Sequence, residues 1–245
     1  MRIYIIRHGQ SEANLDESLH KSVRDEDIKL TQQGQVQAMK TGDWLGGHFA
    51  KLRQGDAPQK IRVFSSPFER VRHTRELIMR GVTDKGAEVE IMVPDINLRE
   101  KSHGVYAGYS EEELRASFSA EYDYYSGEMK AGGERLYKVR PPGGDSYEDI
   151  EHNVDKVIPA IRAAEADGVT DLVIVAHSRS NRVLIKQLTG KSVEEFFKDP
   201  SQPNASVRML EINGPGPAVD KGYIFDPGLQ SFTAQLNAGW KQGRS

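Results

Sequence analysis

Five side chains in this sequence have the chemistry to bind and transfer a phosphoryl group: Arg7, His8, Arg70, Glu100 and His177. Two guanidinium groups can bind a phosphoryl group through paired, charge-assisted hydrogen bonds and balance its negative charge. A neutral imidazole is a competent nucleophile toward phosphorus, and nearby cations favour its neutral form. A second imidazole can donate to the developing charge, and a carboxylic acid can protonate the departing alkoxide. This set predicts phosphoryl transfer through a phosphohistidine, with no metal required.

The elements that must position these side chains are predicted strands. Four short apolar runs have the β-branched composition of strands in a largely buried sheet: residues 3–6, 61–64, 89–93 and 172–176. Arg7 and His8 follow the first run directly, and His177 follows the last. In open parallel α/β sheets, ligands bind at the carboxyl ends of the strands. We therefore expect these side chains to meet at one edge of the sheet, although His8 and His177 lie 169 residues apart in the sequence.

Helical patterns alternate with the predicted strands. Thr31 can cap a helix, which Gly42, Gly46 and Gly47 are expected to end or bend early. A capping box that starts at Ser66, with proline at the next position, predicts a helix over residues 67–79. Three more capping boxes predict helices that begin after Ser110, Ser146 and Ser192. A short terminal helix is predicted from the apolar residues Leu229, Phe232 and Leu236.

This alternation predicts an α/β fold with three layers, in which a mostly parallel sheet has helices on both faces. No repeat, linker or composition shift marks a boundary, so residues 1–245 are expected to form a single domain. Seven of the nine tyrosines lie between residues 106 and 147, which predicts a cap-like insertion around residues 101–145. This insertion is either a lid over the sheet edge or a surface subdomain packed on its own aromatic rings. The acidic run at residues 25–27 is expected to be a solvated loop.

Composition excludes several classes of protein. The 245 residues carry 33 Lys and Arg against 36 Asp and Glu, a net charge of −3, which argues against a nucleic-acid partner. No apolar run approaches the roughly 20 residues of a membrane-spanning helix, and the first apolar run is too short for a signal peptide. Without cysteine there is no disulfide, thiolate metal site or cysteine nucleophile. We expect a cytoplasmic protein whose partner is a small-molecule phosphate ester, with its oligomeric state left open.

Five ordered landmarks resemble the histidine phosphatase superfamily, in its phosphoglycerate mutase-like branch. They are the Arg-His-Gly-Gln-Ser-Glu-Ala-Asn motif at residues 7–14, residues 30–38, residues 65–70 with Thr74, residues 98–101 with Gly104, and residues 176–177. The resemblance covers about residues 1 to 212. It implies that His8 is the phosphorylated nucleophile and Glu100 the proton donor. It also implies a phosphate pocket formed by Arg7, Arg70 and His177, with Asn14 as a further phosphate contact and no cofactor.

The sequence departs from the family pattern at two places. Ser178 stands where the family usually has glycine, and His103 and Arg135 do not reproduce the arginine pair and tyrosine of the mutases. We therefore expect a metal-independent phosphatase of small phosphate esters. The alternatives are a phosphoglycerate mutase and a phosphate-binding protein without turnover. A metal hydrolase is disfavoured because no His-x-His or His-Glu-x-x-His spacing occurs and two arginines would repel a cation.

Overall fold

The core of the protein is a six-stranded sheet with the strand order β3-β2-β4-β1-β5-β6. A computed structural model describes residues 1–53 and 59–228. The strands are β1 (Arg2–Arg7), β2 (Ile61–Ser65), β3 (Val89–Ile91), β4 (Asp171–Ala176), β5 (Val207–Glu211) and β6 (Val219–Phe225). β3, β2, β4 and β1 are parallel, whereas β5 and β6 pair antiparallel at one edge. The predicted α/β fold with a mostly parallel sheet is confirmed.

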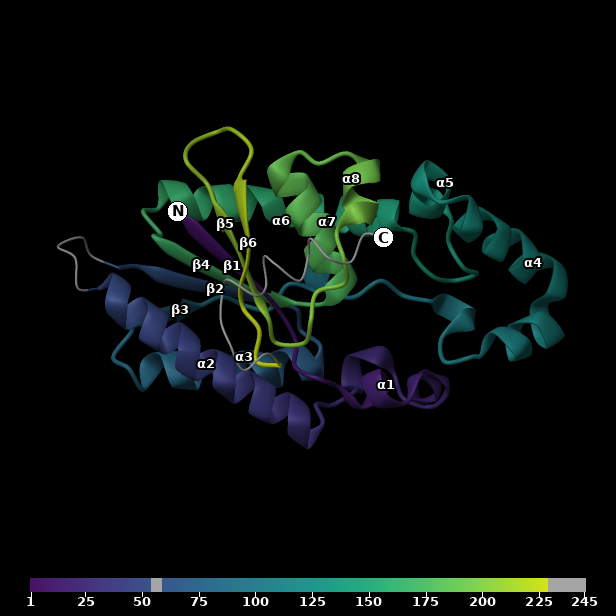
Figure 1. Ribbon diagram of the computed structural model, residues 1–245, viewed down its shortest axis with the longest axis horizontal. Helices are drawn as coiled ribbons and strands as arrows, with labels where there is room; N and C mark the ends of the chain where they lie inside the picture. The colour runs from purple at the N-terminus through teal and green to yellow at the C-terminus, as the bar shows by residue number, and fades with distance from the viewer. Residues whose placement is uncertain (54–58, 229–245) are drawn as a thin grey trace.

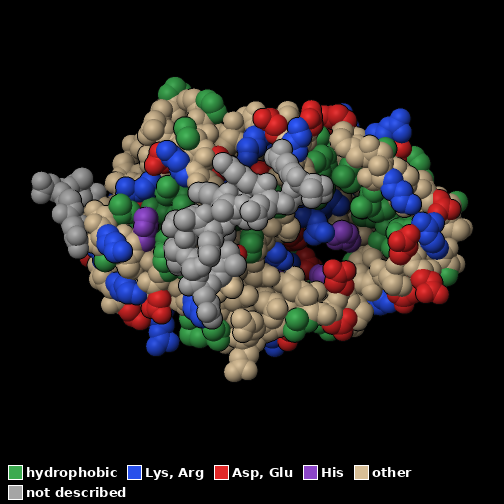
Figure 2. Space-filling model, in the orientation of Figure 1, with side chains coloured by type: hydrophobic (Ala, Val, Ile, Leu, Met, Phe, Trp, Pro, Cys, Tyr) green, Lys and Arg blue, Asp and Glu red, His purple; other side chains and the backbone are tan. Residues whose placement is uncertain are grey.

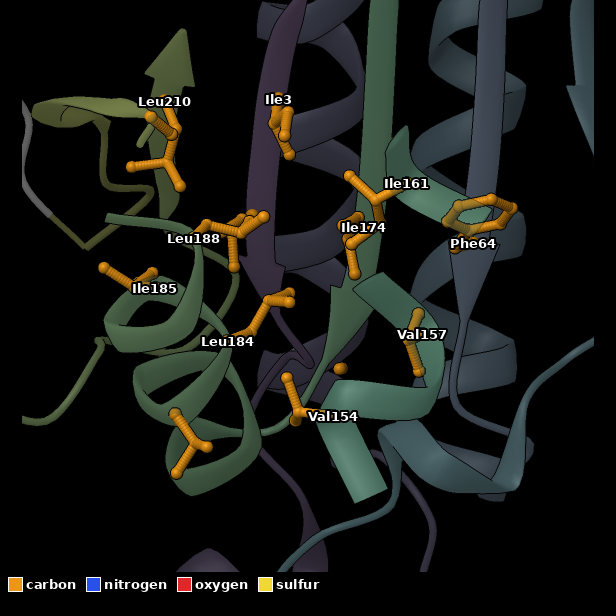
Figure 3. Packing of buried hydrophobic residues seen from close by; sticks show 14 of the residues in the cluster. Ile3, Phe64, Val154, Val157, Ile161, Ile174, Leu184, Ile185, Leu188 and Leu210 are labelled. Carbon is orange, nitrogen blue, oxygen red and sulfur yellow. The ribbon is translucent and has the colours of Figure 1, made fainter. Parts of the chain in front are cut away.

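Helices cover both faces of this sheet (Figure 1). One face carries α2 (Gln32–Leu52) and α3 (Glu69–Thr83), and the other carries α6 (Tyr147–Ala166), α7 (Ser178–Thr189) and α8 (Val193–Lys198). Alternate residues of β1 face opposite layers, because successive side chains of a strand point to opposite sides. Tyr4 and Ile6 pack in the cluster on the α2–α3 side, and Ile3 and Ile5 pack in the cluster with α6 and α7 (Figure 3). The three layers are as predicted.

Residues 101–145, which we call the cap, contact these layers through Tyr137, which packs in the core cluster with α6, α7 and α8. The cap contains α4 (Glu111–Ala131) and α5 (Gly133–Lys138), which lie on the side of the molecule toward which β1 runs (Figure 1). Its buried residues Tyr106, Leu114 and Tyr125 form an aromatic-rich cluster separate from the two core clusters. The cap is therefore packed in part on its own aromatic rings and in part on the core.

The remaining short elements lie on the loops around the site. They are α1 (Glu12–Leu15) and the 3₁₀ turns η1 (Glu17–Lys21), η2 (Asp25–Asp27), η3 (Ile96–Leu98) and η4 (Gly104–Tyr106). η1 connects the core to the cap, since the ammonium of Lys21 lies 2.7 Å from the Glu113 carboxylate. No helix among the described residues is long and apolar enough to cross a membrane. The terminal helix predicted around residues 229–236 falls outside the described residues.

The expectation that glycines end or bend α2 early is wrong. The helix continues to Leu52 because two of these glycines permit close packing against α3. A Cβ atom on Gly42 would lie 2.8 Å from the carbonyl oxygen of Ile78, and one on Gly46 would lie 2.4 Å from that of Gly81. Both distances are shorter than van der Waals contact, so side chains there would force the helices apart. The low helix propensity of glycine is outweighed here by tertiary packing.

Candidate active site

The carboxyl ends of β1 and β4 place His8 and His177 next to each other. Because the two strands pair in parallel register, the residues that follow them emerge at the same edge of the sheet. The backbone N–H of His8 donates to the carbonyl of Ala176 at 3.0 Å. The two imidazole rings lie edge to face with their centroids 5.3 Å apart, and both side chains are buried. The structure thus brings together two histidines that lie 169 residues apart in the sequence.

Hydrogen bonding and burial define the chemical form of His8. Its Nδ1 atom lies 2.7 Å from the carbonyl oxygen of Gly9. A carbonyl oxygen only accepts hydrogen bonds, so Nδ1 carries the proton of the neutral ring and Nε2 keeps a lone pair. Burial, followed by the positive charges of Arg70 and Arg7, holds the pKa of His8 well below its ordinary value. His8 is therefore a neutral imidazole with a lone pair at Nε2.

His177 has a different hydrogen-bonding environment. Its Nε2 atom lies 2.9 Å from the hydroxyl oxygen of Ser66, while Nδ1 is buried without a hydrogen-bond partner among the described residues. Burial, and then the positive charge of Arg70 with a smaller contribution from Arg7, hold the pKa of His177 well below its ordinary value. A buried polar atom without a partner costs roughly 1–3 kcal/mol. Nδ1 is thus an atom that a ligand oxygen could satisfy.

The prediction that Ser66 caps α3 is wrong. The helix begins at Glu69 with Phe68 as its N-cap residue, so Pro67 precedes it. The Ser66 hydroxyl is instead directed toward His177, and the Ser66 backbone N–H continues the pairing with β4. A hydroxyl near a helix start can bind any group within reach, and here a buried imidazole is the closer partner.

Arg7 is anchored by a loop from the C-terminal half of the chain. Its Nη1 atom donates to the carbonyl of Gln202 at 2.7 Å, and its Nε atom is buried without a partner among the described residues. The Gln202 side chain is fixed in turn, because it donates to the carbonyls of Ile5 and Ser206 and accepts from Asn181. Burial lowers the pKa of Arg7, while the charge of Glu100 acts in the opposite direction. The Arg7 guanidinium is therefore oriented by the Gln202 carbonyl, and its Nε–H group can still donate to a ligand.

Arg70 lies in the first turn of α3 and is almost fully buried. Its guanidinium contacts Asp25 twice: Nη2 lies 2.9 Å from the carboxylate, and Nη1 donates to the backbone carbonyl. Asp25 belongs to the acidic run that the sequence analysis treated as a solvated loop. That expectation is wrong for Asp25, which is half-buried against Arg70, whereas Glu26 and Asp27 are exposed. Asp25 thus orients the second arginine of the site.

This ion pair predicts a specific effect of Asp25→Asn, which keeps the shape and the carbonyl contact but removes the charge. We expect kcat to fall about three- to tenfold, because Arg70 loses the charge that orients it. KM should not rise, because a negative charge beside the anion site has been removed. Steady-state kinetics with a phosphate monoester measure both parameters. The matched control is Asp27→Asn, whose carboxylate pairs with the exposed Arg24; equal kinetics of the two variants would rule out the role of Asp25.

Glu100 follows η3 and is half-buried at the boundary between core and cap. Its two carboxylate oxygens accept from the backbone N–H groups of Lys101, at 2.9 Å, and Arg179, at 3.4 Å. The segment is fixed by Arg99, whose guanidinium forms a two-pronged ion pair with Asp145 at 2.5 and 2.8 Å. The hydrogen bond with Arg179, which lies two residues after His177 at the start of α7, holds the Glu100 carboxylate beside the segment that carries the second histidine.

Asn14 is an exposed residue whose side chain is tied to the loop below His8. Its amide oxygen accepts from the backbone N–H of Ser11 at 3.0 Å and from Asn204 at 3.1 Å. Asn204 also donates to the backbone carbonyl of His8 at 3.0 Å. Because the amide oxygen is engaged, the amide nitrogen is the group that Asn14 could offer to an anion.

Ser178, which stands where the family usually has glycine, fits this site without a clash. Its hydroxyl is buried and lies 2.9 Å from the hydroxyl of Ser201. Lys101 and Arg179 flank Glu100, and their position in the sequence alone did not identify them as site residues. Arg179 could have been noticed from its position two residues after the strand that carries His177, where parallel sheets place ligand-binding groups.

The buried histidines predict that stability depends on pH. Burial, and then the charges of Arg179 and Lys101, also lower the pKa of His103, to about 3. An unfolded histidine takes up a proton near pH 6.5 whereas these three stay neutral in the native state, so below that pH the unfolded state binds more protons. We expect the free energy of unfolding to fall as the pH drops from 7 to 5, by up to about 2 kcal/mol per histidine that stays neutral.

Chemical denaturation at the two pH values measures this effect. His8→Asn should weaken the pH dependence, because it removes one of the buried imidazoles. His152→Asn is the control, because that histidine is exposed on α6. If both variants lost the same stability between pH 7 and pH 5, buried neutral histidines would not be the cause.

The described residues contain no group of three or more His, Cys, Asp or Glu side chains that could bind a metal ion. Charged groups gather in a hollow between the core and the side that carries α4 and α5, where Figure 2 shows Lys or Arg, His and Asp or Glu side chains together. The chemistry of this donor set, two guanidiniums and two neutral imidazoles, suits an anion with oxygen acceptors rather than a cation.

Fold and site define a class of protein, in which a three-layer α/β sheet carries two buried histidines after neighbouring parallel strands, one arginine at the end of β1 and a second arginine in the first turn of α3. The sequence model of the histidine phosphatase superfamily (branch 1) matches residues 3–223 of this chain. The protein therefore belongs to the histidine phosphatase superfamily, as its motifs predicted.

Relatives within this superfamily carry different names. The chain is 30% identical over 197 residues to the 2,3-bisphosphoglycerate-dependent phosphoglycerate mutase of Mesorhizobium japonicum, covering 80% of this chain and 85% of the mutase. It is 25% identical to the phosphoglycerate mutase-like protein AT74H of Arabidopsis thaliana, over 88% of this chain and 75% of that protein.

Similar solved structures include a mycobacterial glucosyl-3-phosphoglycerate phosphatase with inorganic phosphate. It has a TM-score of 0.68 and 19% identity, over 94% of this chain and 99% of that one. The α-ribazole phosphatase of Shigella flexneri has a TM-score of 0.66 and 20% identity, over 91% of this chain and 96% of that one. At these identities the structures show the shared fold.

Proposed function

We propose that this protein is a phosphatase that hydrolyses phosphate monoesters through a phosphohistidine at His8. The observation that carries the proposal is the state of the His8 ring. Nδ1 is committed to the Gly9 carbonyl and the pKa is held low, so Nε2 presents a lone pair at neutral pH. Two arginines stand close enough to lower that pKa, which supports an anionic phosphoryl group as the partner of this nucleophile.

The first half-reaction transfers the phosphoryl group to the enzyme. The lone pair of His8 Nε2 forms the bond to phosphorus, and the bond between phosphorus and the ester oxygen breaks. The electron pair of that bond stays on the ester oxygen, which takes the proton of Glu100 and leaves as an alcohol. Arg7 and Arg70 stabilise the charge on the phosphoryl oxygens, since guanidinium groups match their geometry.

The second half-reaction releases phosphate. Glu100, now a carboxylate, takes a proton from a water molecule, whose oxygen attacks phosphorus as the bond to His8 Nε2 breaks. The lone pair returns to Nε2 and the neutral ring is restored. The unpartnered Nδ1 of His177 and Nε of Arg7 are buried atoms that phosphoryl oxygens would satisfy, and the amide nitrogen of Asn14 supplies a further donor.

A second candidate function is phosphoglycerate mutase activity, which the names of the sequence relatives favour. A mutase would use the same phosphohistidine but return the phosphoryl group to another hydroxyl of the substrate instead of to water. The two activities differ in their products, because only hydrolysis releases inorganic phosphate.

The proposal is tested with p-nitrophenyl phosphate and a panel of alkyl phosphates, each assayed with and without a chelator. We expect phosphate release that the chelator does not reduce. Arg70→Lys keeps the charge but loses the two-pronged geometry, so kcat/KM should fall by about two orders of magnitude or more. Arg72→Lys is the matched control, because its guanidinium pairs with Glu69 and Glu76 on the surface of α3.

The mutase alternative is tested in the same preparation. The protein is incubated with 3-phosphoglycerate and a catalytic amount of 2,3-bisphosphoglycerate, and 2-phosphoglycerate and inorganic phosphate are both measured. Isomer formation that clearly exceeds phosphate release would replace the phosphatase proposal by the mutase. Release of phosphate without isomer formation supports the phosphatase.

A further inference from the structure

Two cations beyond the phosphoryl pocket have no role in the chemistry described above. Lys101 follows Glu100 directly, and the residue as a whole is only 5% exposed. Among the described residues its ammonium has no hydrogen bond and no ion pair, and lies 5.6 Å above the ring of Tyr147. An ammonium ion is strongly hydrated, so its burial without a carboxylate partner is unfavourable unless another group compensates the charge.

Arg179 lies on the other side of Glu100, in the first turn of α7. Its backbone N–H donates to the Glu100 carboxylate at 3.4 Å. Burial opposes the charge of the guanidinium, but Glu100 and Tyr147 outweigh burial and leave the pKa of Arg179 raised. The same guanidinium lowers the pKa of Lys101, so the two cations lie within electrostatic range of each other.

The positive charges around Glu100 exceed the negative charges that are free to compensate them. Arg7 and Arg70 together match the charge of about −1.5 to −2 on a bound phosphoryl group. Glu100 must carry a proton when it acts as the acid, and at that moment it neutralises neither Lys101 nor Arg179. Burial, and then Arg179, lower the pKa of Lys101 to about 8, as expected for an ammonium whose charge is incompletely compensated. Asp145 and Asp149 also act on Lys101, but Asp145 is paired with Arg99 and Asp149 with Arg140, so neither is free to compensate the Lys101 ammonium.

We propose that Lys101 and Arg179 form a second anion subsite, which binds a carboxylate or a second phosphate carried by the leaving group of the substrate. The inference rests on the proposed phosphatase function and names its substrate class: phosphate monoesters with a second anionic group. The position fits, since both residues contact the segment that carries the acid, and the acid must lie next to the leaving oxygen. The aromatic ring of Tyr147 beside Lys101 closes one side of the subsite.

The basic residues of α5 are poorer candidates for this role. Arg135 and Lys138 are 68% and 59% exposed on their side chains and lie 3.5 and 3.7 Å from Glu128 and Glu134, respectively. Exposed charges beside carboxylates contribute little to the binding of an anion in water. These two residues therefore serve as controls for the subsite.

Three matched esters test the proposal: propyl phosphate, 3-phosphooxypropanoate and 1,3-propanediol bisphosphate. They share an alkyl leaving group and differ in having no second anion, a carboxylate or a second phosphate. We expect kcat/KM for at least one of the two anionic esters to exceed that for propyl phosphate by about tenfold or more, because charge-assisted hydrogen bonds form in a desolvated site. Which of the two is preferred identifies the second anion.

The variants Lys101→Met and Arg179→Met should lose this preference, so that the ratio falls to within about threefold of one. Lys101→Arg keeps the charge and should retain the preference, which separates anion binding from a purely structural role. Lys138→Met and Arg135→Met are the matched controls and should keep the wild-type ratio. Equal kcat/KM for the three esters in the wild type, or a preference that survives both methionine variants, would overturn the subsite.

A binding measurement tests the anion subsite independently of the proposed phosphatase activity. Titration calorimetry of the His8→Ala protein with the same three esters reports binding without turnover. Tighter binding of an anionic ester, lost when Lys101→Met is added, supports the subsite even if no ester is hydrolysed. Failure to release phosphate from any ester, p-nitrophenyl phosphate included, overturns the phosphatase. Equal binding of the three esters overturns the subsite alone.

Discussion

His8→Ala is expected to lower kcat/KM for every phosphate monoester by about four to six orders of magnitude. The loss is large because the variant removes the atom that bonds to phosphorus, and no neighbouring group can replace it. His177 is the nearest imidazole, but its Nε2 already contacts the Ser66 hydroxyl. Alanine also leaves the Gly9 carbonyl without its donor, so a parallel His8→Asn variant checks that the loss is chemical and not structural.

The covalent intermediate is the direct measurement. Acid quenching during turnover of a ³²P-labelled substrate should yield a phosphoprotein after rapid neutralisation, with the acid-labile and base-stable behaviour of phosphohistidine. The wild type should be labelled and both His8 variants should not. His152→Ala, which removes an exposed histidine from α6, should be labelled like the wild type. Equal labelling of wild type and His8→Ala would refute the mechanism.

Glu100→Gln is expected to distinguish between leaving groups. An alkoxide is a poor leaving group unless it is protonated as it departs, whereas a nitrophenolate departs without help. Glutamine keeps the shape of the side chain, and its single amide oxygen can accept one of the two backbone hydrogen bonds, from Lys101 or from Arg179, but it cannot deliver a proton. We therefore expect a loss of about 10² to 10⁴ in kcat on an alkyl phosphate and a much smaller loss on p-nitrophenyl phosphate.

The ratio of the two losses is the informative quantity, because a general defect in folding or phosphate binding lowers both rates alike. Glu112→Gln, an exposed carboxylate in α4, is the control and should leave both rates near wild type. If Glu100→Gln lost the same activity on both substrates, its role would be structural, and His177 would become the next candidate for the acid.

Local sequence signals were sufficient to predict most of the elements. The strands β1 and β4 are continuous apolar runs that cannot be exposed to water, and their residues line both core clusters. The capping boxes at Ser110, Ser146 and Ser192 all form as predicted, because both partners of such a box lie within three residues of each other. Parallel strands end at the same edge of a sheet. The proximity of His8, which follows β1, and His177, which follows β4, was therefore predictable.

Predictions from local pattern failed where a distant part of the chain supplied the partner. The low helix propensity of glycine predicted a break at Gly42 and Gly46. The close backbone of α3, however, leaves no room for a side chain at either position. Ser66 read as a helix cap, yet its hydroxyl lies against His177, far along the sequence. The acidic run read as a solvated loop, yet Asp25 orients Arg70. In each case a tertiary contact outweighed a local preference of about one kcal/mol.

By itself, then, the sequence determined the class of fold, the family and the identity of the residues at the strand ends, because these depend on hydrophobic pattern and local motif. Only the tertiary structure decided their chemical state. The pKa of His8 depends on burial and on charges contributed by Arg70 and Arg7, and the pKa of Lys101 depends on burial and on the charge of Arg179. Electrostatic interactions act through space and depend on solvent exclusion, so no spacing along a chain specifies them.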